Sequence, residues 1–396
     1  MEARVLEPAK ATLPLESLEI RDFRAFDQLR IERLMRVNLV VGKNGVGKST
    51  LLEAVRLYAN RGSLSVIEKI LYARDEEAPL PAFSGKQEAQ NKLLPIKYLF
   101  HGREDVGLHR GPLLIGPLSR PAEALSIEGV FFYAKGKGYE QITNLDELRT
   151  LNKPVVPGLA IRLGSSFRID QPLDKEDFQA STAISLQPPI APCVFVFNDG
   201  LRMDETAELW DSIVLTELEN DVLKALQIID PDVERVSITT GAIRMVERTD
   251  MSRGPRKREK EPEVDRVPIA KMKGLGEPVT LLSLGDGMNH LFGIALALVN
   301  AKDGILLIDE VENGIHYSAQ EQLWQLILEV AARLNVQVFA TTHSWDCIDA
   351  FQRAMRHGLE PEGQMIRLQR ERGSVLATLF DARKLNIATR EDIEVR

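Results

Sequence analysis

Apolar and polar positions along this chain of 396 residues follow strand-like and helix-like periods in separate stretches. Residues 17–41 contain two short alternating runs, which predict two strands, and the pattern from 123 to 197 is also largely β. Apolar residues at helical spacing predict one long amphipathic helix over 207–229. From 281 onward predicted helices and strands alternate, and this order favours a parallel sheet that helices cover on both faces.

The C-terminal part of the pattern also predicts individual elements. Strands are expected over 305–309 and 336–341, each between two helical stretches. The predicted helices cover about 287–301, 318–333 and 345–356, and a closing hairpin covers 365–369 and 375–380. The sequence therefore predicts an α/β fold, with antiparallel β structure before a mainly parallel sheet.

A glycine-rich turn stands between a predicted strand and a predicted helix. Its sequence G-K-N-G-V-G-K-S-T fits the phosphate-binding pattern G-x-x-x-x-G-K-[ST], and the apolar run 37–41 precedes it. In such a loop the backbone N–H groups and the positive end of the helix dipole surround a phosphate. We therefore expect the chain to bind a nucleoside triphosphate. The candidate binding residues are Gly42, Lys43, Asn44, Gly45, Val46, Gly47, Lys48, Ser49 and Thr50.

A second run supplies the carboxylates that such a site needs. The buried strand pattern at 304–308 ends in Asp309 and Glu310, which is the Walker B form. We expect Ser49 and Asp309 to hold Mg²⁺, and Lys48 to reach the β- and γ-phosphates. Glu310 would orient or deprotonate the attacking water. These residue types predict an ATPase that uses ATP and Mg²⁺.

Two weaker features complete the candidate site. His343 follows the β-rich run 338–342, and at a strand end beside Walker B it would hydrogen-bond a γ-phosphate. Ser283 and Gly285 stand just before a predicted helix, where a hydroxyl, free amides and the helix dipole favour an anion. We expect all three residues to contact nucleotide, with His343 among the catalytic residues.

Composition limits the class of protein. The net charge is −8 and the sequence pI is about 5.5, which argues against a wholly basic nucleic-acid binder. Cys193 and Cys347 share no metal or redox spacing and are expected to be buried free thiols, as suits a reducing cytosol. No apolar stretch approaches the roughly 18–20 residues that span a bilayer. We therefore expect a soluble cytoplasmic protein without a membrane partner.

One segment has an unusual density of charge. Residues 250–266, which follow two short predicted strands, hold six basic and several acidic side chains. We interpret this segment as an exposed, mobile loop. A loop that contacts DNA is the alternative.

The motifs above, in this order, resemble those of ABC-type ATPase heads, which include transporter motors and the SMC, Rad50 and RecF proteins. The segment 283–285 reads S-L-G and departs from the usual L-S-G-G-Q, with Leu284 and Asp286 where Gly and Gln are commoner. The opening I-R-D-F-R-A-F at 20–26 and the run D-E-V-E-N-G-I-H at 309–316 look like the RecF and OLD branch. The closest likeness is to stand-alone OLD-like AAA_15/AAA_21 ATPases without the Toprim nuclease domain.

This resemblance implies a fold, a domain division and partners. The fold would be a P-loop NTPase of ABC type, with a mainly parallel sheet, an antiparallel β subdomain and a helical insertion. The implied parts are a tail at 1–14, lobe I at 15–200, an insertion at 201–280 and lobe II at 281–396. Two or more copies would bind face to face, with Ser283 and Gly285 on the neighbour's γ-phosphate. A separate nuclease or toxin chain is the implied effector.

The resemblance also leaves several residue roles open. His101 lies where such heads carry a glutamine that contacts the metal, and we expect it there. Glu312 is a second acid near the site that binds metal or caps the following helix. Arg24 or Phe26 would contact adenine, unless both are merely exposed residues of a turn.

Three functions fit these observations. The first is a nucleotide-gated ATPase in phage defence or DNA repair, which works through an effector. The second is a transporter motor, which the extension at 312–314, the β region at 123–197 and the charged segment disfavour. The third is a scaffold that binds ATP with little turnover and sequesters a toxin.

Overall fold

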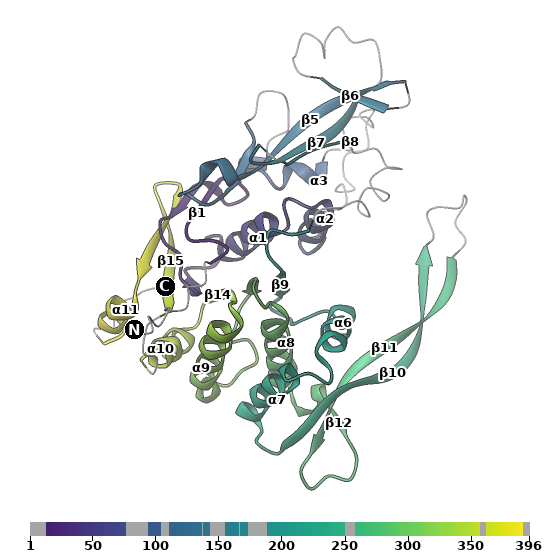
Figure 1. Ribbon diagram of the computed structural model, residues 1–396, viewed down its shortest axis with the longest axis vertical. Coiled ribbons are helices and arrows are strands. Elements are labelled where there is room, and N and C mark those ends of the chain that lie inside the picture. Colours follow the sequence, from purple (N-terminus) through teal and green to yellow (C-terminus); the bar gives the residue numbers. More distant parts are fainter. Residues whose placement is uncertain are drawn as a thin grey trace, which may run out of the picture.

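The computed structural model describes residues 13–76, 94–103, 111–136, 138–142, 155–165, 167–172, 188–249, 258–356 and 362–390. Two β-sheets and their helices form successive layers within these ranges (Figure 1). Part of the predicted charged segment, 250–257, lies outside the described residues. Among the described helices, none is both long enough and apolar enough to cross a bilayer.

A six-stranded sheet forms the centre of the molecule. Its strands pair in parallel except for the hairpin of β15 and β16 at one edge. The order is β16 (Ser374–Phe380), β15 (Gly363–Glu371), β3 (Val37–Val41), β14 (Gln337–Thr342), β13 (Ile305–Ile308) and β9 (Cys193–Val196). The predicted hairpin is thus present, but β15 also pairs with β3, which lies more than three hundred residues earlier.

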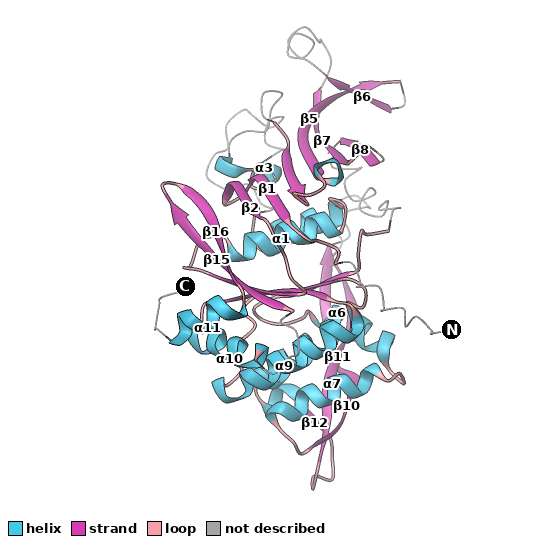
Figure 2. Ribbon diagram, turned by 60° about the vertical axis from the view of Figure 1, so that its left-hand side comes forward, coloured by secondary structure: helices cyan, strands magenta, loops and turns pink. Residues whose placement is uncertain are grey.

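Helices cover both faces of this sheet, as the alternating pattern predicts. The helix α1 (Lys48–Ala59) lies on one face, and α8 (Asp286–Asn300), α9 (Tyr317–Leu334) and α10 (Trp345–Met355) lie on the other (Figure 2). The strands are buried on both sides. Within β13, Leu306 and Ile308 belong to the core under α8 and α9, whereas Ile305 and Leu307 belong to the core under α1.

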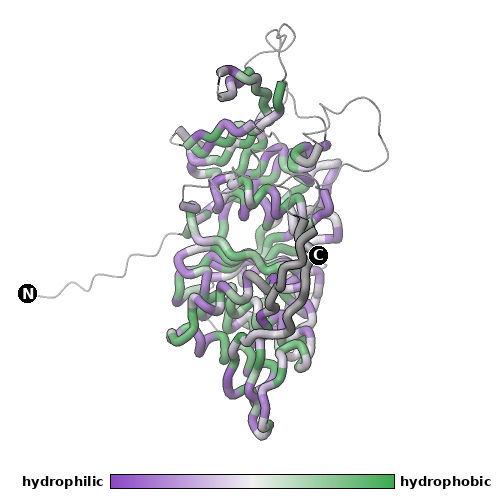
Figure 3. The backbone as a smooth tube through the Cα atoms, turned by 90° about the vertical axis from the view of Figure 1, so that its right-hand side faces the viewer, coloured by the Kyte–Doolittle hydropathy of each residue, from purple (hydrophilic) through white to green (hydrophobic). Residues whose placement is uncertain are grey.

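A second, antiparallel sheet covers the outer side of α1. Its strands share one core with α1 and with the central sheet, so that α1 is enclosed between two sheets. The order is β2 (Phe26–Ile31), β1 (Leu18–Phe23), β4 (Leu113–Gly116), β5 (Leu125–Lys135), β7 (Val155–Leu163) and β8 (Phe167–Pro172), and β6 (Gly138–Ile142) pairs with β5. The hydropathy colouring shows green, hydrophobic stretches across the middle of the molecule (Figure 3).

The prediction of one long helix over 207–229 is wrong. Two helices occupy this stretch, α6 (Met203–Ile213) and α7 (Leu218–Ile229). Leu215 between them has a φ of 64° and is 93% exposed, so the helical hydrogen bonding stops there. The apolar period nevertheless continues across the break, because both helices pack against α8.

The charged segment is also more ordered than predicted. Strands β10 (Val233–Thr249) and β11 (Arg258–Met272) form a long antiparallel ribbon that projects from the helical layer (Figure 1). Its base pairs with β12 (Val279–Thr280). Arg266, predicted within the mobile loop, lies in β11 and makes two hydrogen bonds of 2.5 and 2.8 Å to the carboxylate of Asp211.

The remaining elements are short. They include α11 after the hairpin, which the sequence pattern does not predict, and the 3₁₀ turn η5 just before α8. Their bounds are α2 (Leu64–Tyr72), α3 (Leu94–Lys97), η2 (His101–Arg103), η3 (Pro121–Glu123), η5 (Leu281–Leu284) and α11 (Ala382–Arg390). Together these elements confirm the expected fold class, a P-loop α/β fold with an antiparallel β subdomain and a helical insertion.

Trp324 provides a test of the core beneath the central sheet. Its side chain is fully buried, and its ring lies 4.7 Å from that of Phe351 across α9 and α10. Trp324→Ala should lower the free energy of unfolding by about 3–5 kcal/mol, because it removes buried area and leaves a cavity. Urea denaturation measures this change. The control is Gln322→Ala on the exposed side of α9, with an expected change within about 0.5 kcal/mol; equal losses in both variants would contradict the assignment.

Candidate functional site

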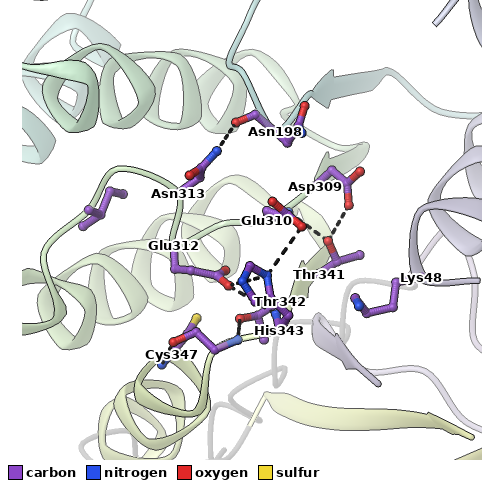
Figure 4. Close-up of polar contacts among 12 residues, drawn as sticks. Lys48, Asn198, Asp309, Glu310, Glu312, Asn313, Thr341, Thr342, His343 and Cys347 are labelled. Carbon is purple, nitrogen blue, oxygen red and sulfur yellow. Dashed lines mark hydrogen bonds and ion pairs between the residues drawn. The ribbon is translucent and has the colours of Figure 1, made fainter. Parts of the chain in front are cut away.

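The carboxyl ends of three neighbouring parallel strands meet at one edge of the central sheet. β3 leads into the glycine-rich loop, β13 into Asp309 and Glu310, and β14 into His343. In open α/β sheets this edge is where ligands bind. Lys48 joins these side chains around a common space (Figure 4). The structure thus brings together the residues predicted from the P-loop, Walker B and the histidine run.

Two glycines of the loop occupy positions that no other residue fits. Gly47 has a φ of 117°, and a Cβ there would lie 2.8 Å from the ring of Phe26. Gly42 has a φ of 150°, and a Cβ there would lie 2.5 Å from the carbonyl oxygen of Leu368. The loop is therefore held between β2 and β15, and α1 begins directly after it at Lys48. This places the N-terminal N–H groups of α1 at the open edge.

Lys48 is held inside the loop. Its Nζ donates a hydrogen bond of 2.8 Å to the carbonyl oxygen of Gly42, and its side chain is buried. Burial lowers the pKa of Lys48, and the nearby carboxylates of Glu310, Asp309 and Glu312 oppose this shift. A phosphate in the loop would add negative charge beside the ammonium group and favour its charged form.

Ser49 and Asp309 face each other across the site. The Ser49 hydroxyl donates to Asp309 Oδ1 at 3.2 Å, and Thr341 Oγ1 donates to the same oxygen at 2.5 Å. Hydroxyl and carboxylate oxygens are ligands that Mg²⁺ accepts together with phosphate oxygens and water. The pair therefore fits the predicted magnesium site. Across the described part of the chain, no cluster of three His, Cys, Asp or Glu side chains offers a metal site by itself.

Glu310 has an unusual backbone conformation. Its φ is 53°, a left-handed value that is uncommon for residues other than glycine and costs conformational energy. Its N–H donates to Thr341 Oγ1 at 2.8 Å, which holds this conformation. The side chain is 34% exposed, and Oε1 lies 3.5 Å from His343 Nδ1. This strained backbone conformation turns the Glu310 carboxylate toward the open edge of the sheet.

His343 lies between two glutamates. Its Nδ1 is 3.5 Å from Oε1 of both Glu310 and Glu312, and its backbone N–H donates to Glu312 Oε1 at 3.2 Å. The imidazole is 55% exposed, so its other face is open to a ligand (Figure 4). This arrangement fits the expected contact with a γ-phosphate.

A hollow of about 450 Å³ lies over the loop and includes Lys48, Ser49, Asp309 and Glu310 in its walls. Sequence reasoning missed three other side chains that line it. These are Arg74, Tyr98 and Arg103. The Arg103 guanidinium lies 5.5 Å from the centre of the Tyr98 ring. For Tyr98 and Arg103, closeness to His101 in the sequence is the one signal that pointed to this side of the hollow, and no signal pointed to Arg74.

The structure corrects the expected environment of Arg24 and Phe26. Phe26 is fully buried beneath the loop and cannot stack on adenine. The Arg24 side chain is only 5% exposed, and its ion pairs join Glu76 at 2.8 Å and Glu53 at 3.2 Å. Burial raises the pKa of Glu53, while Arg24 and Arg74 oppose the rise. Neither Arg24 nor Phe26 is an exposed turn residue. The Arg24 side chain belongs to a buried cluster of ion pairs with Glu53 and Glu76.

His101 lies next to this cluster of ion pairs. Its Nδ1 is 2.8 Å from the carbonyl oxygen of Arg24, which fixes the ring. His101 is described but does not belong to the lining of the 450 Å³ hollow. A role of His101 in metal binding stays a prediction.

The Ser283 and Gly285 segment is exposed. Neither residue, although both are described, lines the hollow over that loop. The Ser283 hydroxyl donates to the carbonyl oxygen of Thr280 at 2.7 Å, and Gly285 has a φ of 110°. The segment is thus ordered and open.

The first turn of α8 is in direct contact with the loop that follows Glu312. A Cβ at Gly287 would lie only 2.1 Å from the carbonyl oxygen of Gly314. The two backbones therefore touch at a point where no side chain fits. The exposed Ser283 segment and the Walker B loop are packed as one unit.

Families of AAA domains match two separate parts of the chain. One, described as "AAA domain, putative AbiEii toxin, Type IV TA system", matches residues 248–346, which include the Ser283 segment, Walker B and His343. The other, described as "AAA domain", matches residues 17–78, which include the phosphate-binding loop.

Two relatives cover different lengths of the chain. An "ATP/GTP phosphatase" of Helicobacter pylori is 23% identical over 368 residues, which is 86% of this chain and 88% of the relative. An uncharacterized protein of Methanocaldococcus jannaschii is 34% identical over 97 residues, which is 24% of this chain and 83% of that protein.

Solved SMC head domains follow a related course over most of the chain. One, an SMC head bound to the C-terminal winged-helix domain of ScpA, covers 95% of this chain and 99% of its own, with 12% identity and a TM-score of 0.47. The SMC head of Thermotoga maritima covers 93% and 99%, with 12% identity and a TM-score of 0.40. The family matches and the P-loop site agree: residues 17–78 and 248–346 are similar to AAA domains.

Proposed function

We propose that this protein is an ATP-hydrolysing ATPase similar to the OLD and RecF proteins, whose nucleotide-gated self-association controls a separate effector. The effector would be a Toprim nuclease or a toxin, in phage defence or DNA maintenance. The observation that carries the proposal is the hydrogen bond between Ser49 Oγ and Asp309 Oδ1, which joins the P-loop to Walker B beside Glu310. The printed name of the Helicobacter relative, a phosphatase of ATP and GTP, supports hydrolysis.

The chain's own residues divide the chemistry among them. Lys48 would leave the Gly42 carbonyl for the β- and γ-phosphates, and Ser49 and Asp309 would hold Mg²⁺. A bound Mg²⁺ supplies charge neutralisation at the phosphates. Glu310 would orient the attacking water or take its proton, because its carboxylate lies at the open edge next to His343.

Self-association follows from where the Ser283 segment lies. It is exposed, ordered and separate from the chain's own hollow, so it contributes nothing to the nucleotide site within one copy. In a face-to-face dimer, Ser283 and Gly285 of each copy would complete the site of the other. Bound ATP would then stabilise the dimer by mass action, and hydrolysis would release it.

One comparison relates the chain to toxin–antitoxin systems. The family that matches 248–346 is described as "AAA domain, putative AbiEii toxin, Type IV TA system". A scaffold that binds ATP with little turnover would carry the same P-loop and Walker B residues. The two functions differ in turnover and in the response of the oligomer to ATP.

Lys48→Ala tests the nucleotide site. The variant should bind ATP about 10- to 100-fold more weakly, because a hydrogen bond to a charged group contributes about 1.5–3 kcal/mol. Titration calorimetry of the Mg·ATP complex measures the affinity. Lys302→Ala, which removes an exposed lysine after α8, is the matched control and should bind like the wild type. Unchanged affinity in Lys48→Ala would contradict the assigned site.

Glu310→Gln separates binding from turnover. The variant should hydrolyse ATP at least about 100-fold more slowly, since it loses the general base, and yet keep its ATP affinity. Light scattering with and without Mg·ATP should show an ATP-dependent dimer that persists in this variant. A stable higher oligomer that ATP does not change, with slow turnover in the wild type, would favour the scaffold.

A mixture of two inactive variants tests whether each site uses two copies. Lys48→Ala removes the loop of a site, and Ser283→Arg blocks the exposed segment, so each variant alone should be inactive. In a mixed dimer both lesions fall in one site and the other is intact. With random pairing the mixture should regain up to about a quarter of wild-type turnover, because half the dimers are mixed and each has one intact site. No recovery in an exchanging mixture would exclude shared sites.

A further inference from the structure

Glu312 is a buried carboxylate that does not fill one of the two roles expected from the sequence, the cap of the following helix. It does not cap α9, because His316 is the N-cap there and its side chain accepts from the Ser318 N–H. It also does not belong to a cluster of three possible metal ligands among the described residues. Its side chain is only 9% exposed, so a different partner must account for it.

The contacts of Glu312 lead to His343. Glu312 Oε1 accepts the backbone N–H of His343 at 3.2 Å and lies 3.5 Å from the imidazole Nδ1 (Figure 4). The other oxygen, Oε2, is buried and has no hydrogen-bond partner within the described structure. In that same part of the chain, His343 is the one basic residue in an ion-pair contact with Glu312.

The charge of Glu312 acts on its surroundings. Its carboxylate raises the pKa of Lys48, whereas burial lowers it. It also raises the pKa of Cys347, as burial does. Both effects have the sign expected of a nearby negative charge. A proton on His343 Nδ1, directed at Oε1, is the stabilising contact available to this carboxylate.

The Glu312 backbone has little freedom. The preceding N–H, of Val311, donates to the carbonyl oxygen of Thr341 at 3.1 Å, and Val311 itself is fully buried. The following residue, Asn313, donates from its backbone to Glu310 at 3.0 Å and from its side chain to the carbonyl oxygen of Asn198 at 2.7 Å. The backbone at Glu312 is therefore held in place, so that its carboxylate can orient the His343 ring.

We propose that Glu312 is a positioning residue for His343. One Nδ1–H cannot point at Glu310 and Glu312 together, although both oxygens lie 3.5 Å away. Glu312 holds the ring through Nδ1 and the backbone N–H. Nε2 is then presented to the γ-phosphate, and Glu310 is left to act on water. This inference rests on the proposed function for the identity of the phosphate, but the hydrogen bond itself does not depend on it.

Histidine NMR of the nucleotide-free protein tests the hydrogen bond directly. The chain has six histidines, and the His343→Gln variant assigns the signal of interest. In the wild type the ¹⁵N shifts of His343 should show a protonated Nδ1. In Glu312→Gln the amide oxygen still accepts the backbone N–H but the charge is gone, so the population of the Nδ1-protonated form should fall. Glu312→Ala should lose both contacts and give a mobile ring.

Two controls keep this result specific. Glu329→Gln on the exposed side of α9 should leave the His343 signal unchanged. Glu310→Gln should change it less than Glu312→Gln does. Wild-type His343 shifts in both Glu312 variants, or a response to Glu310→Gln alone, would overturn the proposal. Thermal melting confirms that each variant is folded.

Kinetics give the second readout. Glu312→Gln should lower kcat by up to about 100-fold, with KM near the wild-type value, because a misplaced group is costly in the transition state. Equal loss of affinity and rate would indicate a structural role and overturn the proposal. If the wild type has no ATPase activity, the proposed function fails, but the NMR result still decides whether Glu312 holds His343.

Discussion

The pairing of β14 between β3 and β13 determines the geometry of the whole site. Its register places Thr341 opposite Val40 on one side, and Ala340 opposite Ile308 on the other. Thr341 therefore stands one residue beyond the end of β13, where its hydroxyl accepts the Glu310 N–H and donates to Asp309. A register shift of one residue would turn this hydroxyl to the opposite face of the sheet and separate the two carboxylates from the loop.

The same pairing explains why the site combines distant parts of the sequence. β3 and β14 are neighbours in space, but most of the antiparallel sheet, the ribbon and most helices lie between them in the chain. The antiparallel sheet encloses α1 against the central sheet, which fixes the helix whose first turn carries Lys48 and Ser49. The phosphate-binding loop thus depends on both sheets, even though it belongs to only one.

Much of this arrangement could be predicted from the sequence, because its signals are local. The P-loop motif indicates a strand before it and a helix after it. Buried parallel strands such as β13 appear as unbroken apolar runs. The break at Leu215 could not be found, since the apolar period of α6 and α7 continues across it. Nor could the burial of Arg24: its partners Glu53 and Glu76 lie on other elements, and a charged residue in a turn is ordinarily exposed. Glu312 was found as a site residue, but its partner depends on tertiary contacts that no spacing encodes.

The contact between Gly287 and Gly314 has a consequence for the movements available to the protein. Two backbones that touch without side chains have no compressible layer between them, so the first turn of α8 cannot move toward the Walker B loop without displacing it. In the proposed dimer, the α8 terminus would contact the nucleotide of the neighbour, whereas the Walker B loop would serve the chain's own. This steric contact would then couple the two hydrolysis events.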